Sequence, residues 1–514
     1  MRRKQSLNRR QFLGAVGAGV GVAGCAANSG VPDLFPPGMN PGSTATESRE
    51  LAVALESSAL RSMAEPRLPT DPKALLLDHI TYGTRPADIT EINNLGYSAY
   101  LERQLNPEII DDWQMNARLM PFTSLSLDAT TISGMGWDRS PELGAAALLR
   151  AVYSKRQLHE KMVEFWSDHF NINQFATNAW YHKPVDDREV IRPYALGRFR
   201  DLLLASARSP AMLVYLNGNE NRAGHPNENY AREVMELHTV GVNAGYTHRD
   251  VQDMARAMTG WTVGASGPNF NLFEFRSEFH DTGPKQIMGL SLPAGGGISD
   301  GEQALNYLAA HPATARNIVE KLVAYFISED LPQALVNQAT TRFTITGGDI
   351  KATLRVILKE TAITQATPKI KRPLHLIADI ARKSAATVSA TTQLVQIPAA
   401  MGHQPFTWSM PDGFPQRSDY WAPGLLSRWN VITLLAGGSY TFIPISPYYM
   451  GQAAGAVTTD QVVALWNQKF FGGRMSTEDQ AQLAAYINRS PDNLLRKYNE
   501  SFVLALSLSD FQYY

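Results

Sequence analysis

Apolar residues recur at spacings of three and four along most of the chain from about residue 49 onward. This period places them on one face of an α-helix, so the pattern predicts a mainly helical body. Three further helices are expected to close the chain after residue 423. The helices predicted before that point cover 51–62, 73–82, 86–105, 145–169, 188–206, 228–240, 247–258, 303–310, 314–328, 350–361 and 374–386.

The pattern changes after Trp261. Residues 270–279 alternate between apolar and polar, and glycines cluster at 289 and 295–297. Alternation and glycine-rich turns are typical of strands, so a small β-hairpin or loop insertion is expected around 262–300. Residues 402–423 are rich in Pro, Trp and Tyr and predict a packed irregular segment. The expected fold is mainly α: a large multi-helix orthogonal bundle that forms a single domain over 49–514.

The amino-terminal residues resemble an export signal. Residues 8–13 read Asn-Arg-Arg-Gln-Phe-Leu, which is similar to the twin-arginine signal of bacteria. The 13 residues from Phe12 to Gly24 are apolar and small. A transmembrane helix needs about 20 residues, so this stretch is too short to be one. We therefore expect residues 1–24 to be a signal peptide read by the twin-arginine export machinery.

The end of this signal resembles a lipobox. Residues 22–25 read Val-Ala-Gly-Cys, and Cys25 is the single cysteine of the chain. Cleavage before Cys25 would expose it for lipidation, with residues 25–48 as a Pro- and Ser-rich disordered tether. The alternative is an ordinary free cysteine that follows small residues. The expected location is the periplasmic or cell-surface side of the envelope, and Ala26 favours the outer membrane over the inner one.

Charge and cysteine content exclude several classes of function. Removing residues 1–24 leaves 42 basic and 48 acidic residues, a net charge of −6. This balance gives no basic footprint for nucleic acid, so no nucleic-acid partner is expected. A single cysteine excludes an intrachain disulfide and a thiolate metal cage. A divalent metal, if one is the cofactor, would be held by His, Asp, Glu or backbone oxygen.

The first candidate constellation is the run Glu-Phe-Trp-Ser-Asp-His at 164–169. His169 falls on the apolar face of the predicted helix, Asp168 lies at its edge, and Glu164 and Ser167 face away. A histidine on an apolar face is usually a core residue with one polar partner. The functional alternative is an imidazole with a shifted pKa that acts as a base or metal ligand.

Two further helices carry charged residues at helical spacing. Glu228, Arg232 and Glu236 are four residues apart, which is typical of a surface ion-pair ladder; if that face were covered, they would form a buried network. Asn227 suits the N-cap of this helix, and Glu233 suits its first turns. Thr247 and Asp250 form a capping box for the next helix. Its residues Asp253 and Arg256 are expected to join the Arg232 network.

The last constellation is Phe-His-Asp-Thr-Gly at 279–283, in the predicted loop insertion. His280 and Asp281 are well placed for catalysis or ligand binding, since loops often carry function. Asp-Thr-Gly is equally typical of an ordinary turn. The chain lacks the Gly-x-Ser-x-Gly, phosphate-loop, dinucleotide, His-Glu-x-x-His and Cys-x-x-Cys-His motifs.

Taken in order, these motifs resemble the bacterial family called domain of unknown function 1800. The Asn-Glu-Asn-Tyr-Ala-Arg-Glu run at 227–233 and the Thr-Gly-Trp run at 259–261 are distinctive. The resemblance implies a mainly helical, exported protein whose gene often lies beside that of a sulfatase-like exported protein, and it implies no particular activity. His238 departs from the family pattern, which has an aromatic residue there, and this argues against a shared catalytic role for His238.

The leading hypothesis is a periplasm-facing hydrolytic enzyme, metal-assisted in one version. Its site would lie between the three motif helices and the His280 loop. The alternative is a non-catalytic scaffold or accessory lipoprotein for a co-exported, sulfatase-like partner. The residues expected at the enzyme site are His169, His280 and Asp281 for catalysis, and Asp168, Arg232, Glu233, Glu236, Asp253 and Arg256 for binding.

Overall fold

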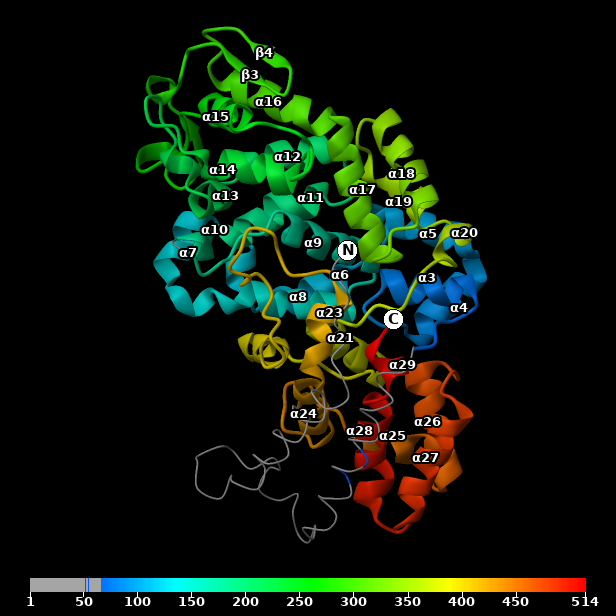
Figure 1. The fold of residues 1–514 in the computed structure, drawn as a ribbon. Helices are drawn as coiled ribbons and strands as arrows, with labels where there is room; N and C mark the ends of the chain where they lie inside the picture. The colour runs from blue at the N-terminus through cyan, green and yellow to red at the C-terminus, as the bar shows by residue number, and fades with distance from the viewer. Residues whose placement is uncertain (1–50, 52–53, 55–65, 177) are drawn as a thin grey trace, which may run out of the picture.

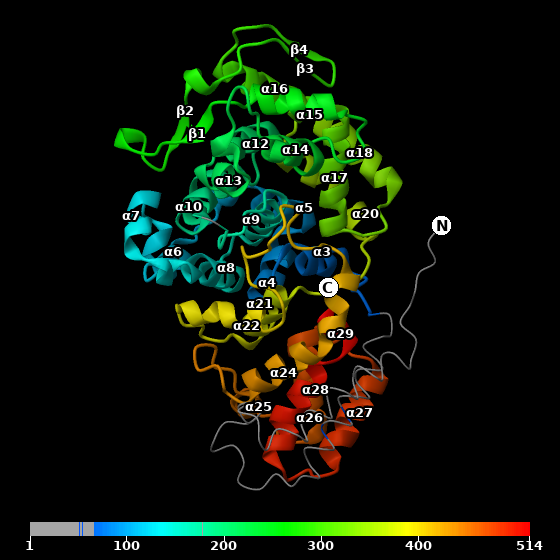
Figure 2. The ribbon, with the colours of Figure 1, turned by 60° about the vertical axis from the view of Figure 1, so that its left-hand side comes forward.

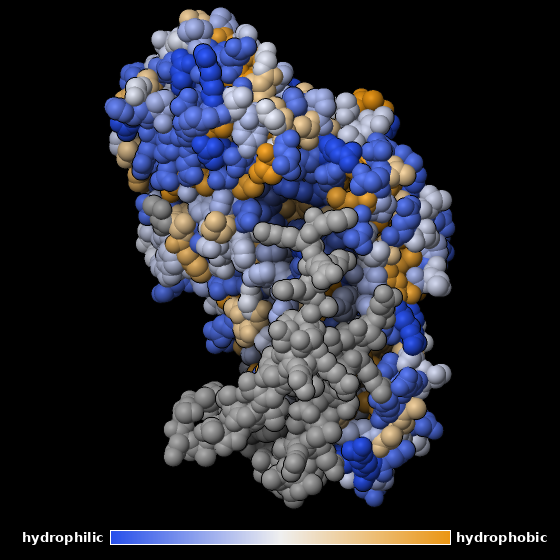
Figure 3. Space-filling view, in the orientation of Figure 1, coloured by the Kyte–Doolittle hydropathy of each residue, from blue (hydrophilic) through white to orange (hydrophobic). Residues whose placement is uncertain are grey.

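The computed structural model describes residues 51, 54, 66–176 and 178–514 (Figure 1). The chain is mainly α-helical there, as predicted. The predicted signal peptide, the tether, Cys25 and most of the predicted helix at 51–62 lie outside the described residues. No helix in the described part of the chain is long and apolar enough to cross a membrane. On the face drawn in Figure 3, the coloured apolar residues lie scattered among polar ones.

Several of the first helices of the described part pack on α8 and α9: α6 contacts α8, and α3 and α5 contact α9. Gly96, with φ +82°, divides the predicted helix 86–105 into α4 and α5, because it adopts a left-handed backbone conformation that ends a helix. The predicted helix 145–169 is likewise divided at Ser154, whose ψ of 137° is extended. The bounds are α3 Pro72–Ile80, α4 Pro86–Leu95, α5 Tyr97–Leu105, α6 Trp113–Leu119, α7 Ala129–Met135, α8 Pro141–Tyr153 and α9 Gln157–His169.

The middle of the chain forms the upper part of the molecule in Figures 1 and 2. The predicted helix 188–206 is interrupted before Phe199, where the backbone of Arg198 is extended. The bounds are α10 Ala179–Asp186, the π-helical turn η5 Asp187–Ile191, α11 Arg192–Tyr194, α12 Phe199–Ala207, α13 Pro210–Tyr215, α14 Glu228–Glu233, the π-helical turn η7 Val234–His238, α15 His248–Ala257, α16 Ile298–Ala310, α17 Pro312–Phe326, α18 Gln333–Ile345, α19 Ile350–Ile357 and α20 Glu360–Ile363.

The predicted insertion contains two small antiparallel hairpins. Strand β1 (Trp261–Val263) pairs with β2 (Phe273–Phe275), and Trp261 lies opposite Phe275. Strand β3 (Lys285–Ile287) pairs with β4 (Leu290–Leu292), and Lys285 lies opposite Leu292. In Figure 2, β3 and β4 lie at the upper end of the molecule, beyond α16, and β1 and β2 lie at its upper left.

The chain closes with more helices than the three predicted. Of the segment 402–423 that was predicted to be irregular, residues 402–417 are irregular, whereas Ser418–Trp421 form the short helix α23. Helices α24–α29 form the lower part of the molecule (Figure 1). The bounds are α21 Pro373–Ser384, α22 Gln396–Ala399, α23 Ser418–Trp421, α24 Leu425–Ala436, α25 Pro447–Ala453, α26 Thr459–Phe471, α27 Thr477–Asn488, the π-helical turn η12 Leu495–Glu500, α28 Ser501–Leu506 and α29 Ser509–Gln512.

Two large hydrophobic clusters form most of the core. The first contains the apolar face of α9 and the helices of the upper part, for example Phe165 and Trp166. The second contains α8, α21 and the closing helices, for example Ile377 and Trp466. Helices α9 and α21 therefore belong to different clusters, and their polar side chains meet between the two.

Candidate functional site

The polar face of α9 is buried. Leu158, Met162, Phe165 and Trp166 pack into the first hydrophobic cluster, as the sequence predicts for the apolar face. The other face does not turn to solvent. Lys161 is 1% exposed and Ser167 is 6% exposed. The side chain of Glu164 is 16% exposed. Helix α21 and the irregular segment 402–417 cover this face, which sequence periodicity alone could not reveal.

Glu164 is the centre of a cluster of polar side chains that includes residues from three parts of the chain. The Tyr82 hydroxyl donates a hydrogen bond of 2.7 Å to Oε2 of Glu164. Nε2 of His375 lies 2.8 Å from the same oxygen, and Nη1 of Arg372 lies 3.2 Å from Oε1. Burial raises the pKa of Glu164, but His375 and Arg372 outweigh burial and hold it well below its usual range. Glu164 is therefore an ionised carboxylate.

Lys161 and His375 extend this cluster into a chain of three groups. Nζ of Lys161 lies 3.3 Å from Nδ1 of His375, whose Nε2 contacts Glu164. A lysine nitrogen that donates to Nδ1 leaves the proton of the neutral imidazole on Nε2, where it bonds the carboxylate. Burial lowers the pKa of His375 to about 4 and that of Lys161 to about 7. A neutral imidazole thus connects a low-pKa amine to a carboxylate.

Asp168 lies one turn beyond Glu164 and shares the same arginine. Nη1 of Arg372 is 2.6 Å from Oδ2 of Asp168, and Nη2 donates to the carbonyl of Phe414 at 3.3 Å. Burial raises the pKa of Asp168 to about 6, and the neighbouring charge of Glu164 adds to this while Arg372 opposes it. Two carboxyls on one helix therefore have pKa values shifted in opposite directions, a pattern typical of acid–base sites.

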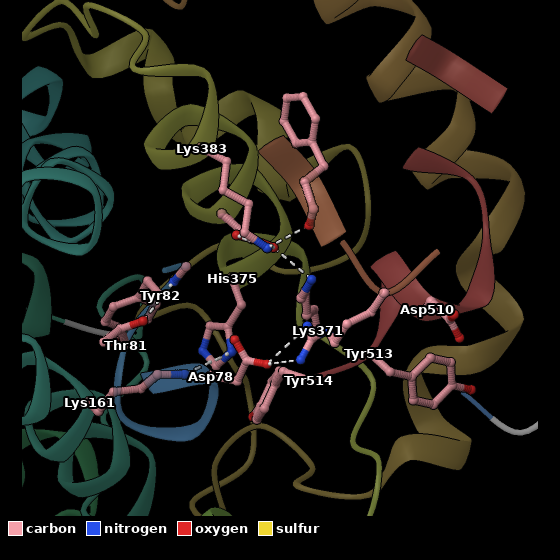
Figure 4. A pocket seen from close by; sticks show the side chains of 14 residues that line it. Asp78, Thr81, Tyr82, Lys161, Lys371, His375, Lys383, Asp510, Tyr513 and Tyr514 are labelled. Atoms are coloured by element: carbon pink, nitrogen blue, oxygen red, sulfur yellow. Dashed lines mark hydrogen bonds and ion pairs between the residues drawn. The ribbon is translucent and has the colours of Figure 1, made fainter. Parts of the chain in front are cut away.

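Two clefts reach this cluster. The Lys161 cleft has an empty volume of about 390 Å³, including its open mouth, and Tyr82, Lys161, Lys371, His375, Asp379 and Tyr514 are among its lining residues (Figure 4). The Asp168 cleft has about 550 Å³, and Glu164, Ser167, Asp168, Asn171 and His403 are among its lining residues. Tyr82 lines both clefts. Figure 4 shows Lys161 extending toward His375, with Tyr82 and Tyr514 nearby.

The site offers hydrogen-bonding and acid–base groups rather than metal ligands. Within the described ranges, no group of three or more His, Cys, Asp or Glu side chains is arranged to hold a metal ion. The divalent metal considered from the sequence therefore has no fitting set of ligands in the part of the chain that the structure describes.

A family model described as a protein of unknown function (DUF1800) matches residues 75–513. The chain belongs to the DUF1800 family. No curated protein matches it, and no solved structure does. All the residues that line the two clefts of this DUF1800 protein, except Tyr514, lie within the matched residues.

Of the residues predicted for the site, Asp168 lies in the buried cluster and His169 lies beside it in the core. The ring of His169 packs against Phe170, and its Nε2 contacts the carbonyl oxygen of His238 at 3.1 Å. Lys321 lies 3.3 Å from its other nitrogen. His238 packs its ring against Phe170 and Tyr230.

The predicted residues of the insertion form a separate cluster in this DUF1800 protein. Arg256 binds both oxygens of Asp281 at 2.9 Å and Asp253 at 2.7 Å. His280 contacts the carbonyl oxygen of Thr259 at 2.8 Å and the Asp300 carboxylate at 3.3 Å. These contacts tie α15 to the loop before β3. Arg256 bonds to Asp281, Asp253 and the Pro284 carbonyl rather than to the Arg232 ladder.

The predicted ladder on α14 and η7 is present and is partly exposed. Arg232 lies 2.9 Å from Glu228 and 3.6 Å from Glu236, and its side chain is 39% exposed. Burial, together with the charge of Glu236, raises the pKa of Glu233. Of the two predicted alternatives, a surface ion-pair ladder and a buried network, the structure has the surface ladder.

Sequence reasoning missed Lys161, His375 and Arg372, and it did not give Tyr82 or Glu164 a place in the site. One signal was present. The run Lys-Ile-Lys-Arg-Pro-Leu-His at 369–375 places several basic residues at the start of an otherwise apolar helix. All of Pro373–Arg382 is buried in α21. Charged residues inside a helix that is apolar all round indicate a buried polar contact.

Proposed function

We propose that this DUF1800 protein is an enzyme, hydrolytic in class, whose acid–base centre is the relay Lys161–His375–Glu164. The observation that carries the proposal is the burial of these three groups together with Arg372 and Asp168. Buried ion pairs are often no more stable than packed apolar residues, because both charges lose their hydration. These polar groups lie between the two hydrophobic clusters. Apolar residues in their place would join the two clusters, so the stability of the fold alone does not explain why polar residues occupy these positions.

The relay supports proton transfer near neutral pH. An amine with a pKa of about 7 is half neutral there and can accept a proton from water or from a substrate hydroxyl in the Lys161 cleft. His375 holds the amine by its Nδ1, and Glu164 holds the imidazole by its Nε2. Arg372 keeps Glu164 charged. Metal assistance is not part of the proposal, because the described residues offer no fitting ligand group.

The proposal includes export and lipid anchoring. It rests on the twin-arginine run at 8–13 and on Cys25 after Val-Ala-Gly, residues outside the described part of the chain. The twin-arginine route carries folded proteins, so the buried relay would be assembled before export. The enzyme would then act on the periplasmic or cell-surface side of the envelope.

A comparison of the wild-type protein with Glu164→Gln tests the enzyme. Both are assayed at pH 7.5 against chromogenic carboxylic esters, phosphoesters, glycosides and amides. The amide keeps the shape of Glu164 but cannot stabilise a positive charge on His375. We expect kcat on the substrate that the wild type cleaves to fall about a hundredfold or more. Glu228→Gln, on the partly exposed ladder, is the matched control and keeps full activity.

Two outcomes would contradict the enzyme. Equal activity of wild type and Glu164→Gln would remove the relay from the reaction. A wild type that cleaves no substrate of the panel and copurifies with a stoichiometric protein partner would support the alternative, a scaffold or accessory lipoprotein for a co-exported sulfatase-like partner.

A further inference from the structure

Lys161 differs from the other buried lysines of the described residues. Its side-chain partner is the neutral imidazole of His375, and no carboxylate of the described residues lies within ion-pair distance of its Nζ. Each of the other four has an oxygen partner: Lys183 binds Asp186, Lys285 binds Asp300, Lys371 binds Asp379, and Lys369 donates to the carbonyls of Ala324 and Tyr325. The amine of Lys161 therefore touches no carboxylate directly, and the nearest acting carboxylate, Glu164, lies on the far side of His375.

The surroundings of this amine are aromatic and open to a cleft. Nζ of Lys161 lies 4.5 Å from the ring centre of Tyr82 and 4.9 Å from that of Tyr514. Both tyrosines and His375 line the same cleft as Lys161. A nucleophile hydrogen-bonded to a base, which a third group orients in turn, is the arrangement of enzymes that form covalent intermediates. In this arrangement Lys161 is in the position of the nucleophile, His375 in that of the base and Glu164 in that of the orienting group.

We propose that Lys161 is a nucleophile that forms an imine with a small carbonyl compound bearing a carboxylate. The proposal goes beyond the hydrolytic function and shares with it only the position of the reactive centre. The aromatic rings of Tyr82 and Tyr514 suit the flat carbonyl carbon. The mouth of the cleft is lined by Lys371, Lys383 and Arg474 together with Asp78, Asp379 and Asp510. Lys371 and Lys383, which share Asp379 at 2.6 Å and 3.0 Å, are the cations that the carboxylate would meet.

The chemical step balances without a further reactant. The nitrogen lone pair of Lys161 forms a bond to the carbonyl carbon, and the C=O π electrons move to the oxygen. His375 takes a proton from the nitrogen at Nδ1, while Glu164 stabilises the imidazolium, and it returns the proton to the oxygen. The C–O bond then breaks as the second amine proton goes to the departing hydroxyl. Both amine protons leave in one water molecule, and a C=N bond remains.

The test is reductive trapping with pyruvate as the probe. The full-length protein is incubated with pyruvate and sodium cyanoborohydride at pH 7.5, and the adduct is located by peptide mass mapping. We expect one reduced adduct per chain, at Lys161. Lys369 is the internal control, because burial lowers its pKa to about 7 as well, yet it does not line the cleft. Acetone, which lacks the carboxylate, is expected to label Lys161 at least about tenfold more slowly.

The variants Lys161→Met and His375→Gln complete the test. Lys161→Met is expected to lose the adduct, and folded His375→Gln to form it more slowly. Peptide mass mapping of the wild-type protein shows whether Lys161 carries the adduct, even if a variant does not fold. No adduct at Lys161, or equal labelling of Lys161, Lys369 and surface lysines, overturns the proposal. If Lys161 is unlabelled while Glu164→Gln still loses hydrolytic activity, the imine is wrong and the proposed enzyme stands.

Discussion

At the scale of single residues, the main feature of this protein is a set of ionisable groups whose pKa values are shifted by burial. Lys161 has its pKa lowered to about 7, and Asp168 has its pKa raised to about 6. In both cases loss of hydration disfavours the charged form, and this is the largest cause. A folded state that keeps such groups has a measurable dependence of stability on pH.

The first residue-scale prediction concerns Lys161→Met. The pKa of Lys161 is about 7 in the folded state and 10.5 as a model value, so the folded state binds fewer protons than the unfolded state between these pH values. Its contribution to the free energy of unfolding therefore rises with pH across this window. Methionine has no such dependence. We expect the stability of Lys161→Met, relative to wild type, to be greatest near pH 7 and to fall by about 1.4 kcal/mol per pH unit toward pH 10.

Urea unfolding of both proteins at pH 7, 8.5 and 10 measures this difference. The other groups that act on the amine, chiefly Glu164, Arg372, Lys369 and Asp379, are present in both proteins, so most of their own titration cancels. Parallel pH profiles would mean that Lys161 has an ordinary pKa in the folded protein, and its role as a neutral base would then be wrong.

At the scale of elements, the segment 402–417 closes the polar face of α9. Asn171 donates to the carbonyls of Trp408 at 3.1 Å and Met410 at 2.6 Å. Gly413 has φ +75°, and a Cβ there would overlap the carbonyl oxygen of Asp168. The absence of a side chain at Gly413 thus allows the segment to pack directly on the backbone of α9, next to the Arg372 contact.

Gly413→Ala is therefore expected to destabilise the protein more than Gly402→Ala does. Gly402 has a similar φ of +80° and nothing within 4 Å of the added Cβ. It therefore carries only the cost of a left-handed alanine, about 1–2 kcal/mol. Gly413→Ala carries this cost and the overlap with α9, so we expect a further loss of about 1–3 kcal/mol. Thermal unfolding measures both; equal melting temperatures would show that the segment does not press on α9.

At the scale of the whole molecule, two hydrophobic clusters enclose one polar layer. Helix α9 contributes Lys161, Glu164 and Asp168, and α21 contributes His375 and Asp379. These helices are more than 200 residues apart in the chain, as the His375–Glu164 contact shows. The layer and its clefts thus require both parts of the molecule to be folded, which suits a protein expected to cross the membrane in its folded state.

The expected anchoring gives a prediction at this scale. In cells, Cys25→Ser should move the protein from the membrane fraction to the soluble fraction, because serine cannot carry the thioether-linked lipid. Fractionation followed by immunoblotting measures the shift. Replacing Arg9 and Arg10 together by lysine is the companion variant and should leave the protein in the cytoplasm. Membrane association of Cys25→Ser unchanged from wild type would exclude lipid on Cys25 as the anchor.

Several features of this protein could be derived from its sequence. Helical periodicity is a local property, so the existence of most helices, the insertion near 262–300 and the capping box of Thr247 and Asp250 were correctly predicted. Helix ends were less certain: Gly96 and Ser154 each divide a run that remains periodic across the break. The ladder of Arg232 also follows from spacing alone.

Only the tertiary structure decided where the candidate site lies. Periodicity shows that α9 has a polar face, but a buried polar face has the same sequence pattern as a solvated one. The difference arises because α21 and the segment 402–417 cover Lys161 and Glu164, and this contact joins distant parts of the chain. Burial is also what shifts the pKa values of these groups. The sequence thus determined which elements form. Packing between segments that are distant in the sequence determined which charged residues were desolvated and therefore have shifted pKa values.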